Sequence, residues 1–140
     1  MKKLLNIDGG GVRVYWSLLV LEYIENKTGK QIVDLFDYFS GVSASSIVMG
    51  CLLTKYSIKE LIDMFEIISK KMFYRSWYDF IISLNGLLYS KYSDHYIEQE
   101  FKAIFEDTRL HQVKKPLSIL SYDLISYTPI TFESWNNTNS

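Results

Sequence analysis

Cysteine is almost absent from this sequence, and so is any excess of charge. The 140 residues include one cysteine, Cys51, which excludes a disulfide framework and a cysteine-ligated metal site. Fifteen lysines and arginines stand against sixteen aspartates and glutamates, for a formal net charge of -1. This balance lacks the basic stripe of nucleic-acid-binding proteins, so we expect no nucleic-acid partner. Cys51 lies in an apolar run and is predicted to be a buried structural thiol.

The sequence also lacks a long apolar run, an internal repeat and a low-complexity linker. A membrane-spanning helix needs about 18 consecutive apolar residues, and no stretch approaches that length. The basic start resembles a signal peptide, but the apolar stretch that follows it stops at Asn6. We therefore expect a cytoplasmic protein that meets membranes only at their surface. The 48% hydrophobic residues predict one globular domain, and the 16% aromatic residues favour an interface or an apolar ligand surface.

Hydrophobic periodicity predicts the element order of an α/β domain. A buried strand over 4–7 should end in a tight glycine turn, and a largely buried helix over 15–27 should close at Gly29. A strand over 36–42 then runs into Ser43, and an apolar helix follows over 45–53. The other predicted elements are helices near Gln31, after the capping box Ser57/Glu60 and over 94–105, and strands over 117–122 and 130–132. This order predicts a mainly parallel sheet, with sites beyond the carboxyl ends of its strands.

The segment Gly41-Val42-Ser43-Ala44-Ser45 follows the second predicted strand. A serine in a sharp strand-to-helix turn presents its Oγ at the sheet edge, and its neighbours must be small because strand and helix pass close together. The amino end of the next helix directs N–H groups and the positive end of its dipole toward charge developing near the serine. Two interpretations follow: Ser43 is a nucleophile, or it is the N-cap of a buried helix.

A second turn, Asp8-Gly9-Gly10-Gly11-Val12-Arg13, follows the first predicted strand. Three glycines remove every side chain from the turn, so backbone N–H groups can face a bound oxyanion at close range. A nucleotide loop is a weak alternative, because a Rossmann fingerprint requires glycine in place of Val14 and the Gly-Lys-Ser/Thr of a P-loop is absent. A plain tight turn is the other alternative, and it carries an entropic cost.

Taken together, the two turns resemble the patatin-like phospholipase family. The likeness continues through Asp107-Thr108-Arg109-Leu110-His111-Gln112-Val113 and Pro116-Leu117-Ser118-Ile119-Leu120-Ser121-Tyr122-Asp123-Leu124. The resemblance implies a three-layer α/β/α fold with a mainly parallel central sheet, of which residues 1–140 are the N-terminal portion. It implies hydrolysis of acyl esters of phospholipids and neutral lipids by a Ser–Asp dyad, with no metal and no other cofactor. A phospholipid or another acyl lipid is then the expected partner, with peripheral membrane contact.

The resemblance also assigns roles to individual residues. It makes Ser43 the nucleophile, and it places Arg13 beside the oxyanion loop, either to help hold the anionic intermediate or to position the turn through a surface ion pair. Asp8 is expected to fix the turn by hydrogen bonds to backbone N–H groups. The family pattern usually has glycine where this chain has Val14 and Ser45. We expect a side chain at Ser45 to crowd the elbow, but serine is small enough for the turn to survive. The residues that match the oxyanion loop and the elbow are Gly9, Gly10, Gly11, Gly41, Ala44 and Ser45.

The family's general base is an aspartate in a downstream Asp-Gly-Gly or Asp-Gly-Ala motif. The only Asp-Gly pair here is Asp8-Gly9, which already belongs to the glycine turn. We therefore expect the base to lie beyond Ser140 and the 140 residues alone to hydrolyse little, because a serine without its base is a weak nucleophile. The alternative is a catalytically inactive relative that binds lipid or a protein partner.

Three other titratable residues and one aromatic segment each have two interpretations. His95 and His111 are expected to be structural, as lone histidines usually are, and not partners of Ser43. Asp123 follows a predicted strand and is expected to hold a turn and not to act as the base. Residues 70–82 mix basic and aromatic side chains, which fits either a membrane-interface contact or lid, or the core of a helical cap.

Overall fold

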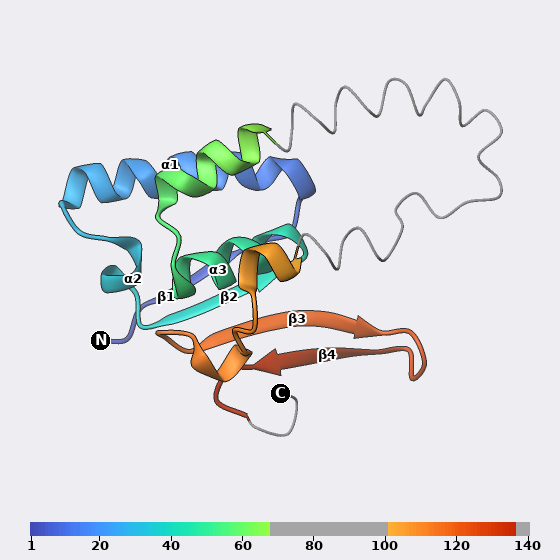
Figure 1. The fold of residues 1–140 in the computed structure, drawn as a ribbon. Coiled ribbons are helices and arrows are strands. Elements are labelled where there is room, and N and C mark those ends of the chain that lie inside the picture. The colour runs from blue at the N-terminus through green and yellow to red at the C-terminus, as the bar shows by residue number, and fades with distance from the viewer. Residues whose placement is uncertain (68–100, 137–140) are drawn as a thin grey trace, which may run out of the picture.

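A four-stranded sheet forms the centre of the computed structural model, which describes residues 1–67 and 101–136 (Figure 1). Its strands, in spatial order, are β1 (Leu4–Ile7), β2 (Tyr38–Val42), β3 (Leu117–Asp123) and β4 (Thr128–Glu133). β1 pairs with β2 and β2 with β3 in parallel, whereas β4 returns antiparallel to β3. The fold is therefore α/β with a mainly parallel sheet, as predicted, and it is consistent with a patatin-like α/β/α arrangement.

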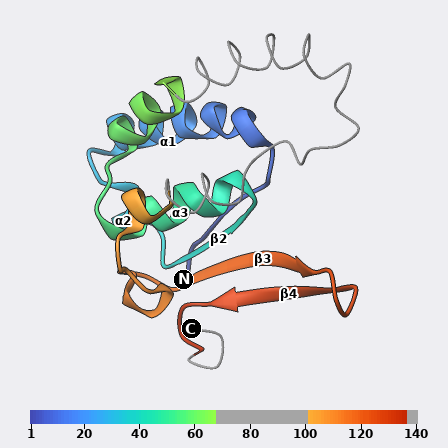
Figure 2. The same cartoon turned by 45° about the vertical axis from the view of Figure 1, so that its right-hand side comes forward.

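Helices cover one face of this sheet in both ribbon views (Figures 1 and 2). α1 (Val14–Thr28) follows the short 3-10 turn η1 (Gly11–Arg13), and α3 (Ala44–Thr54) follows β2 after a single residue. α2 (Ile32–Leu35) is one turn long, η3 (Leu110–Gln112) precedes β3, and residues 58–67 and 101–105 are also helical. α1 ends as predicted at Gly29, whose φ of 65° is a left-handed conformation that glycine adopts without strain.

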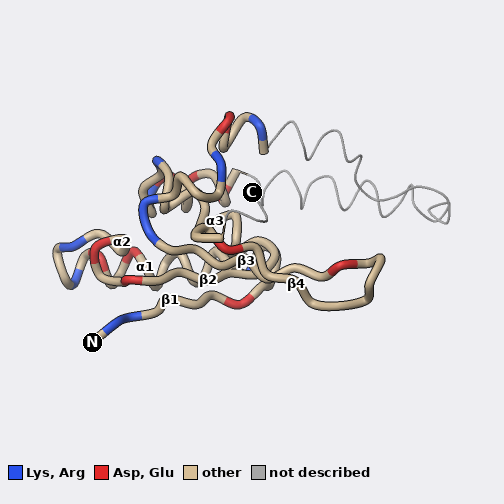
Figure 3. Tube along the Cα trace, turned by 90° about the horizontal axis from the view of Figure 1, so that it is seen from below, with Lys and Arg blue, Asp and Glu red and all other residues tan. Residues whose placement is uncertain are grey.

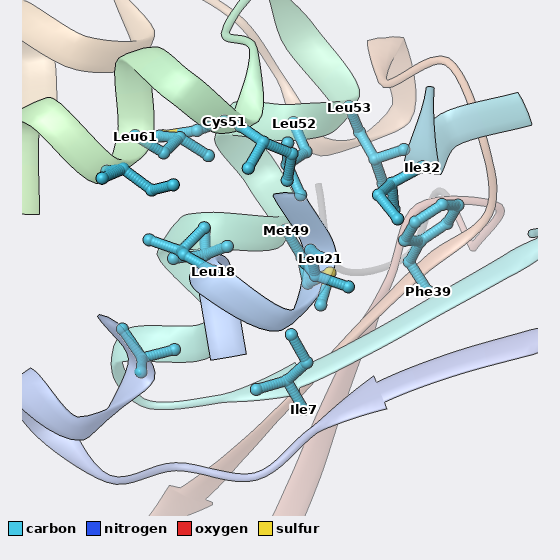
Figure 4. Close-up of a cluster of buried hydrophobic side chains, with 14 of the residues drawn as sticks. Ile7, Leu18, Leu21, Ile32, Phe39, Met49, Cys51, Leu52, Leu53 and Leu61 are labelled. Atoms are coloured by element: carbon cyan, nitrogen blue, oxygen red, sulfur yellow. The ribbon is translucent and has the colours of Figure 1, made fainter. Parts of the chain in front are cut away.

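The hydrophobic core lies between the helices and the sheet (Figure 4). Phe39 of β2, Leu18 of α1 and Leu53 of α3 are each 0% exposed. α3 buries seven of its eleven residues, which explains why its sequence has no charged face. Cys51 belongs to this core, and burial raises the pKa of its thiol to about 12, so it is the structural thiol that was predicted.

The predicted capping box opens the helix over residues 58–67. The Ser57 N–H donates to Glu60 Oε2 over 2.7 Å, and the Glu60 N–H donates in return to Ser57 Oγ over 3.3 Å. The Ser57 N–H, and after it the Ser57 hydroxyl, which donates to Glu60 Oε2 over 2.7 Å, favour the ionised carboxylate and hold the pKa of Glu60 below its ordinary value. Of the helix predicted over 94–105, residues 101–105 are described and helical; the earlier part lies outside the described residues.

The surface of the described chain combines mixed charge with apolar side chains. Basic and acidic residues are interspersed along the chain, in keeping with its balanced composition (Figure 3). Leu120 and Tyr122 of β3 are about half exposed, at 47% and 52%, and the Tyr38 ring packs against Trp135 with centroids 5.4 Å apart. Within residues 1–67 and 101–136, no helix has the length and apolar character needed to cross a membrane.

Candidate active site

Ser43 joins β2 to α3 in a backbone conformation that residues with a side chain rarely adopt. β2 ends at Val42, α3 begins at Ala44, and Ser43 makes the turn between them with φ 59° and ψ -132°. Such a conformation costs about 1–3 kcal/mol and persists only where the surrounding structure enforces it. Strain of this kind is concentrated at functional sites, and a strained serine between a strand and a helix is the geometry of a nucleophile elbow.

Gly41 allows the elbow to close. A Cβ at this position would lie 2.8 Å from the Ser46 amide nitrogen and 2.9 Å from the Ser45 carbonyl carbon, which are backbone atoms of α3. These distances are shorter than a carbon atom tolerates, so strand and helix meet here only because residue 41 has no side chain. The small residue that the sequence pattern requires before the serine thus has a steric reason.

The side chain of Ser43 is exposed and takes no part in capping α3. Ser43 occupies the N-cap position, yet it makes no side-chain capping hydrogen bond. Its carbonyl oxygen accepts hydrogen bonds from the Ser46 N–H over 3.0 Å and from the Ser46 hydroxyl. An ordinary N-cap serine accepts a bond from the N–H two or three residues on. The N-cap interpretation therefore lacks its hydrogen bond among the described residues, and Ser43 Oγ is left available for other chemistry.

The glycine turn lies against this elbow. β1 and β2 are parallel, so the turn after Ile7 and the turn after Val42 both fall at the carboxyl edge of the sheet. A Cβ on Gly9 would lie 3.0 Å from the Val42 carbonyl oxygen and 3.3 Å from Ser43 Cβ. The absence of a side chain at Gly9 is therefore what lets the two turns touch.

The rest of the glycine turn is shaped by Gly11 and Arg13. Gly11 has φ 56°, a left-handed conformation that favours glycine, and it begins η1. The Arg13 N–H donates to the Gly10 carbonyl oxygen over 3.1 Å, and Arg13 Nε makes a long bond of 3.5 Å to the same oxygen. The two ion pairs in the described part of the chain involve Lys2 with Asp37 and Lys55 with Glu106, so the surface ion pair expected as one role of Arg13 is not formed there.

Asp8 is held by a neighbouring side chain. Its Oδ1 accepts a hydrogen bond from Asn6 Nδ2 over 3.1 Å. Among the described residues, Asp8 therefore makes this bond with the Asn6 side-chain amide and not the bonds to backbone N–H groups that were expected. Residues two apart in a strand point to the same face, which is why Asn6 reaches Asp8 at the end of β1.

Ser45 plays a part that the sequence did not suggest. Its side chain is 0% exposed and fully hydrogen-bonded. Ser45 Oγ accepts from the Val42 N–H over 2.9 Å, and its hydroxyl is within donating distance of the Ile7 and Val42 carbonyl oxygens, at 2.7 and 2.8 Å. The sequence signal for this role of Ser45 is its departure from the family pattern, which has glycine at this position and no hydroxyl.

Asp123 lies at the same edge of the sheet but is committed to the turn between β3 and β4. Its Oδ2 accepts from Ser126 Oγ over 2.6 Å, and its Oδ1 accepts from the Ile125 N–H over 2.9 Å. The Ser126 hydroxyl, and after it the Ile125 N–H, hold the pKa of Asp123 below its ordinary value. A carboxylate with a lowered pKa is a weaker base, so the turn interpretation of Asp123 is supported.

His111 lies at the opposite edge of the sheet from Ser43. It belongs to η3, which precedes the amino end of β3, and the nearby Lys114 N–H donates to the carbonyl oxygen of Leu53, close to the far end of α3. His111 is therefore not brought to Ser43. His95 and the aromatic segment 70–82 lie outside the described residues.

The fold and the two touching turns define a class: an α/β protein whose candidate site lies at the carboxyl edge of a mainly parallel sheet. Comparison with known protein families narrows this class to one family. The family model described as patatin-like phospholipase matches residues 5–140, and the chain belongs to this family.

Several curated proteins are similar to the chain over nearly all of its length. Patatin-17 of Solanum cardiophyllum is 28% identical over 154 residues, covering 100% of this chain and 38% of its own. Patatin-like protein 4 of Arabidopsis thaliana is 26% identical over 148 residues, covering 95% of this chain and 37% of its own. A Solanum tuberosum protein named probable inactive patatin-3-Kuras 1 is 25% identical over 150 residues, with coverages of 97% and 38%. The chain thus spans about 37–38% of the length of these relatives.

Proposed function

We propose that the protein is a serine lipid acyl hydrolase in which Ser43 is the nucleophile. The observation that carries the proposal is the strained turn at Ser43, with φ 59°, an exposed side chain and the side-chain-free Gly9 against it. The strained backbone at Ser43 lowers the stability of the fold, and the side chain makes no capping hydrogen bond that would offset this loss. Membership of the patatin-like phospholipase family supports the same assignment.

The proposed reaction is acyl transfer through an ester of Ser43. Ser43 Oγ attacks the carbonyl carbon of an acyl ester and passes its proton to a general base, and the carbonyl oxygen becomes an oxyanion. N–H groups of the Gly9–Gly11 turn and the first N–H of α3, at Ala44, are the donors proposed to face this oxyanion, with Arg13 adding positive charge. The alcohol then leaves with a proton from the base, and water hydrolyses the acyl-enzyme by the same steps.

The general base is proposed to be an aspartate supplied outside the described residues. Within residues 1–67 and 101–136, Ser43 Oγ makes no hydrogen bond to a carboxylate, although direct proton transfer requires a separation of about 2.6–3.2 Å. The carboxylates at this edge of the sheet, Asp8 and Asp123, are engaged by Asn6 and by the β3–β4 turn. The family resemblance points to an Asp-Gly-Gly or Asp-Gly-Ala motif as the source.

The proposed substrates are acyl esters of phospholipids or neutral lipids, met at a membrane surface. α1, which begins directly after the glycine turn, exposes Trp16, Val20 and Tyr23 at 69%, 58% and 62%. Their spacing places them along one side of the helix. Tryptophan and tyrosine favour the boundary between headgroups and acyl chains, so this side of α1 suits a peripheral contact with lipid.

A second candidate function is lipid or protein binding without catalysis. It is favoured by the absence of a base on Ser43 in the described residues and by a relative whose name describes it as probably inactive. The two candidates differ in one respect that can be measured, which is whether Ser43 turns over an ester.

Ester hydrolysis by the full-length polypeptide tests the proposal, meaning residues 1–140 with whatever the reading frame encodes on either side. A short acyl ester such as p-nitrophenyl butyrate is the probe. Wild type should turn over, Ser43→Ala should fall to the uncatalysed rate, and Ser121→Ala, which removes an exposed hydroxyl from β3, should match wild type. Equal turnover by wild type and Ser43→Ala would move the nucleophile elsewhere, and no turnover by wild type would favour the binding function.

A further inference from the structure

We infer that Ser45 is a positioning residue: its hydroxyl sets the spacing between the glycine turn and the nucleophile, Ser43. This inference rests on the proposed function of Ser43. It starts from a buried hydroxyl that joins two strands: Ser45 Oγ accepts from the Val42 N–H over 2.9 Å and lies 2.7 Å from the Ile7 carbonyl oxygen, to which it donates. The side chain is 0% exposed, so water does not compete for these bonds.

The Ser45 hydroxyl lies at the position where the strand register would place the next backbone hydrogen bond between β1 and β2. The Tyr38 N–H donates to the Lys3 carbonyl oxygen over 3.3 Å, and the pairing continues to Ile7 opposite Gly41. In a parallel pair the same offset recurs every second residue, which assigns the Val42 N–H to the Ile7 carbonyl. Ser45 Oγ bonds to both of these groups. It thereby bridges the two strands through a side chain at the point where they reach the site.

That bridge is adjacent to both halves of the candidate site. Val42 immediately precedes Ser43, and Ile7 is two residues before Gly9, whose Cβ position lies 3.3 Å from Ser43 Cβ. The backbone of Ser45 packs closely on Gly41 of β2, since a Cβ added to Gly41 would lie 2.9 Å from the Ser45 carbonyl carbon. The hydroxyl therefore links the oxyanion turn to the elbow through a buried residue that packs closely on β2.

The single hydroxyl proton has two acceptors, the carbonyl oxygens of Ile7 and Val42, at 2.7 and 2.8 Å. Loss of the hydroxyl leaves the Val42 N–H without this acceptor and the Ile7 carbonyl without this donor, at a place where the strands carry the two turns. The end of β1 is then free to move by a few tenths of an ångström relative to Ser43. Small misplacements of reacting groups slow chemistry more than they weaken binding.

The test is the kinetics of covalent labelling of the full-length polypeptide by a fluorophosphonate probe, which separates reversible binding (KI) from bond formation (kinact). Ser45→Ala should lower kinact about tenfold or more and leave KI within a factor of two. Thr54→Ala is the matched control. Thr54 is also a hydroxyl residue of α3 with two carbonyl acceptors, those of Gly50 and Cys51, but it lies at the other end of the helix. Its kinact should stay within a factor of two of wild type.

Ser45→Gly provides a second variant, which removes the hydroxyl and its Cβ and should show the same selective loss of kinact. Wild-type kinact in both Ser45 variants overturns the inference and leaves the role of Ser43 intact. An equal fall in Thr54→Ala, or failure of both Ser45 variants to fold, shows a purely structural role and overturns it as well. Absence of labelling in wild type, or equal labelling of Ser43→Ala, refutes the proposed function, and the inference falls with it.

Discussion

Replacement of Gly9 by alanine should slow acylation of Ser43 while leaving the protein folded. The added Cβ would lie 3.0 Å from the Val42 carbonyl oxygen and 3.3 Å from Ser43 Cβ and from Val42 Cγ1. Ordinary contact requires a few tenths of an ångström more, so the glycine turn must move away from the elbow. Gly9 is exposed, which lets the turn move as a loop and keeps the cost in stability near the low end of overpacking, about 1 kcal/mol.

The effect on rate should exceed the effect on stability. Loss of one oxyanion-hole donor costs about 10²–10³ in rate, and a misplacement of about 1 Å costs about 10². A shift of a few tenths of an ångström should then lower the acylation rate by about tenfold to a hundredfold. The assay is fluorophosphonate labelling of the full-length polypeptide, with the urea midpoint measured on the same preparation.

Gly29→Ala is the matched control for Gly9→Ala. Gly29 has φ 65° and no atom within 4 Å of its Cβ position, so alanine there is strained by its backbone alone, by about 1–2 kcal/mol. It lies at the far end of α1 from the glycine turn. This variant should lose stability and keep the wild-type labelling rate. The reasoning is refuted if Gly9→Ala labels as fast as wild type, or if Gly29→Ala slows by the same factor.

Three further predictions concern packing, pH and the membrane. Gly41→Ala would bring a carbon within 2.9 Å of backbone atoms of Ser45 and Ser46 in α3, so it should cost about 1–3 kcal/mol and lower the urea midpoint. A wild-type midpoint would contradict the close packing. The pKa of Asp123 is lowered in the folded state, chiefly by the Ser126 hydroxyl, so its stabilising contribution is complete above the ordinary value of 3.8 and disappears as the pH falls through the folded value. Asp123→Asn should therefore be less stable than wild type at pH 6 and approach it toward pH 2, and a difference independent of pH would refute the argument. Trp16→Ala with Tyr23→Ala should lower hydrolysis of vesicle phospholipid several-fold and leave hydrolysis of a soluble ester unchanged, whereas an equal loss on both substrates would argue against a membrane contact.

Periodicity in the sequence was sufficient to predict most of the fold. The apolar run before the glycines, the helix closed by Gly29 and the apolar helix after Ser43 are all confirmed, because each depends on local patterning and on residues with strong conformational preferences. The helix near Gln31 exists but is only one turn long. The antiparallel return of β4 was not predicted, although the turn that produces it is held by local hydrogen bonds from Ile125 and Ser126 to Asp123.

The geometry of the candidate site was predictable only in outline. Two turns that follow parallel strands must lie at one edge of the sheet, so the sequence could bring the glycine turn and Ser43 to the same side. The contact at Gly9, the φ of Ser43 and the bridge made by Ser45 depend on register and on distances of tenths of an ångström, which no residue pattern specifies. The sequence shows the size of Ser45, and so predicts crowding that a small serine can relieve, but it does not show the buried hydrogen-bond partners of the hydroxyl.

The most direct test of the central claim is to locate the adduct of a fluorophosphonate probe on the full-length polypeptide by peptide mass spectrometry. An activated serine reacts with such a probe, while serines that serve as caps or lie on the surface do not. We predict a single phosphonylated residue, Ser43, and loss of the adduct in Ser43→Ala. An adduct on another serine, or a folded protein that no probe concentration labels, would contradict it.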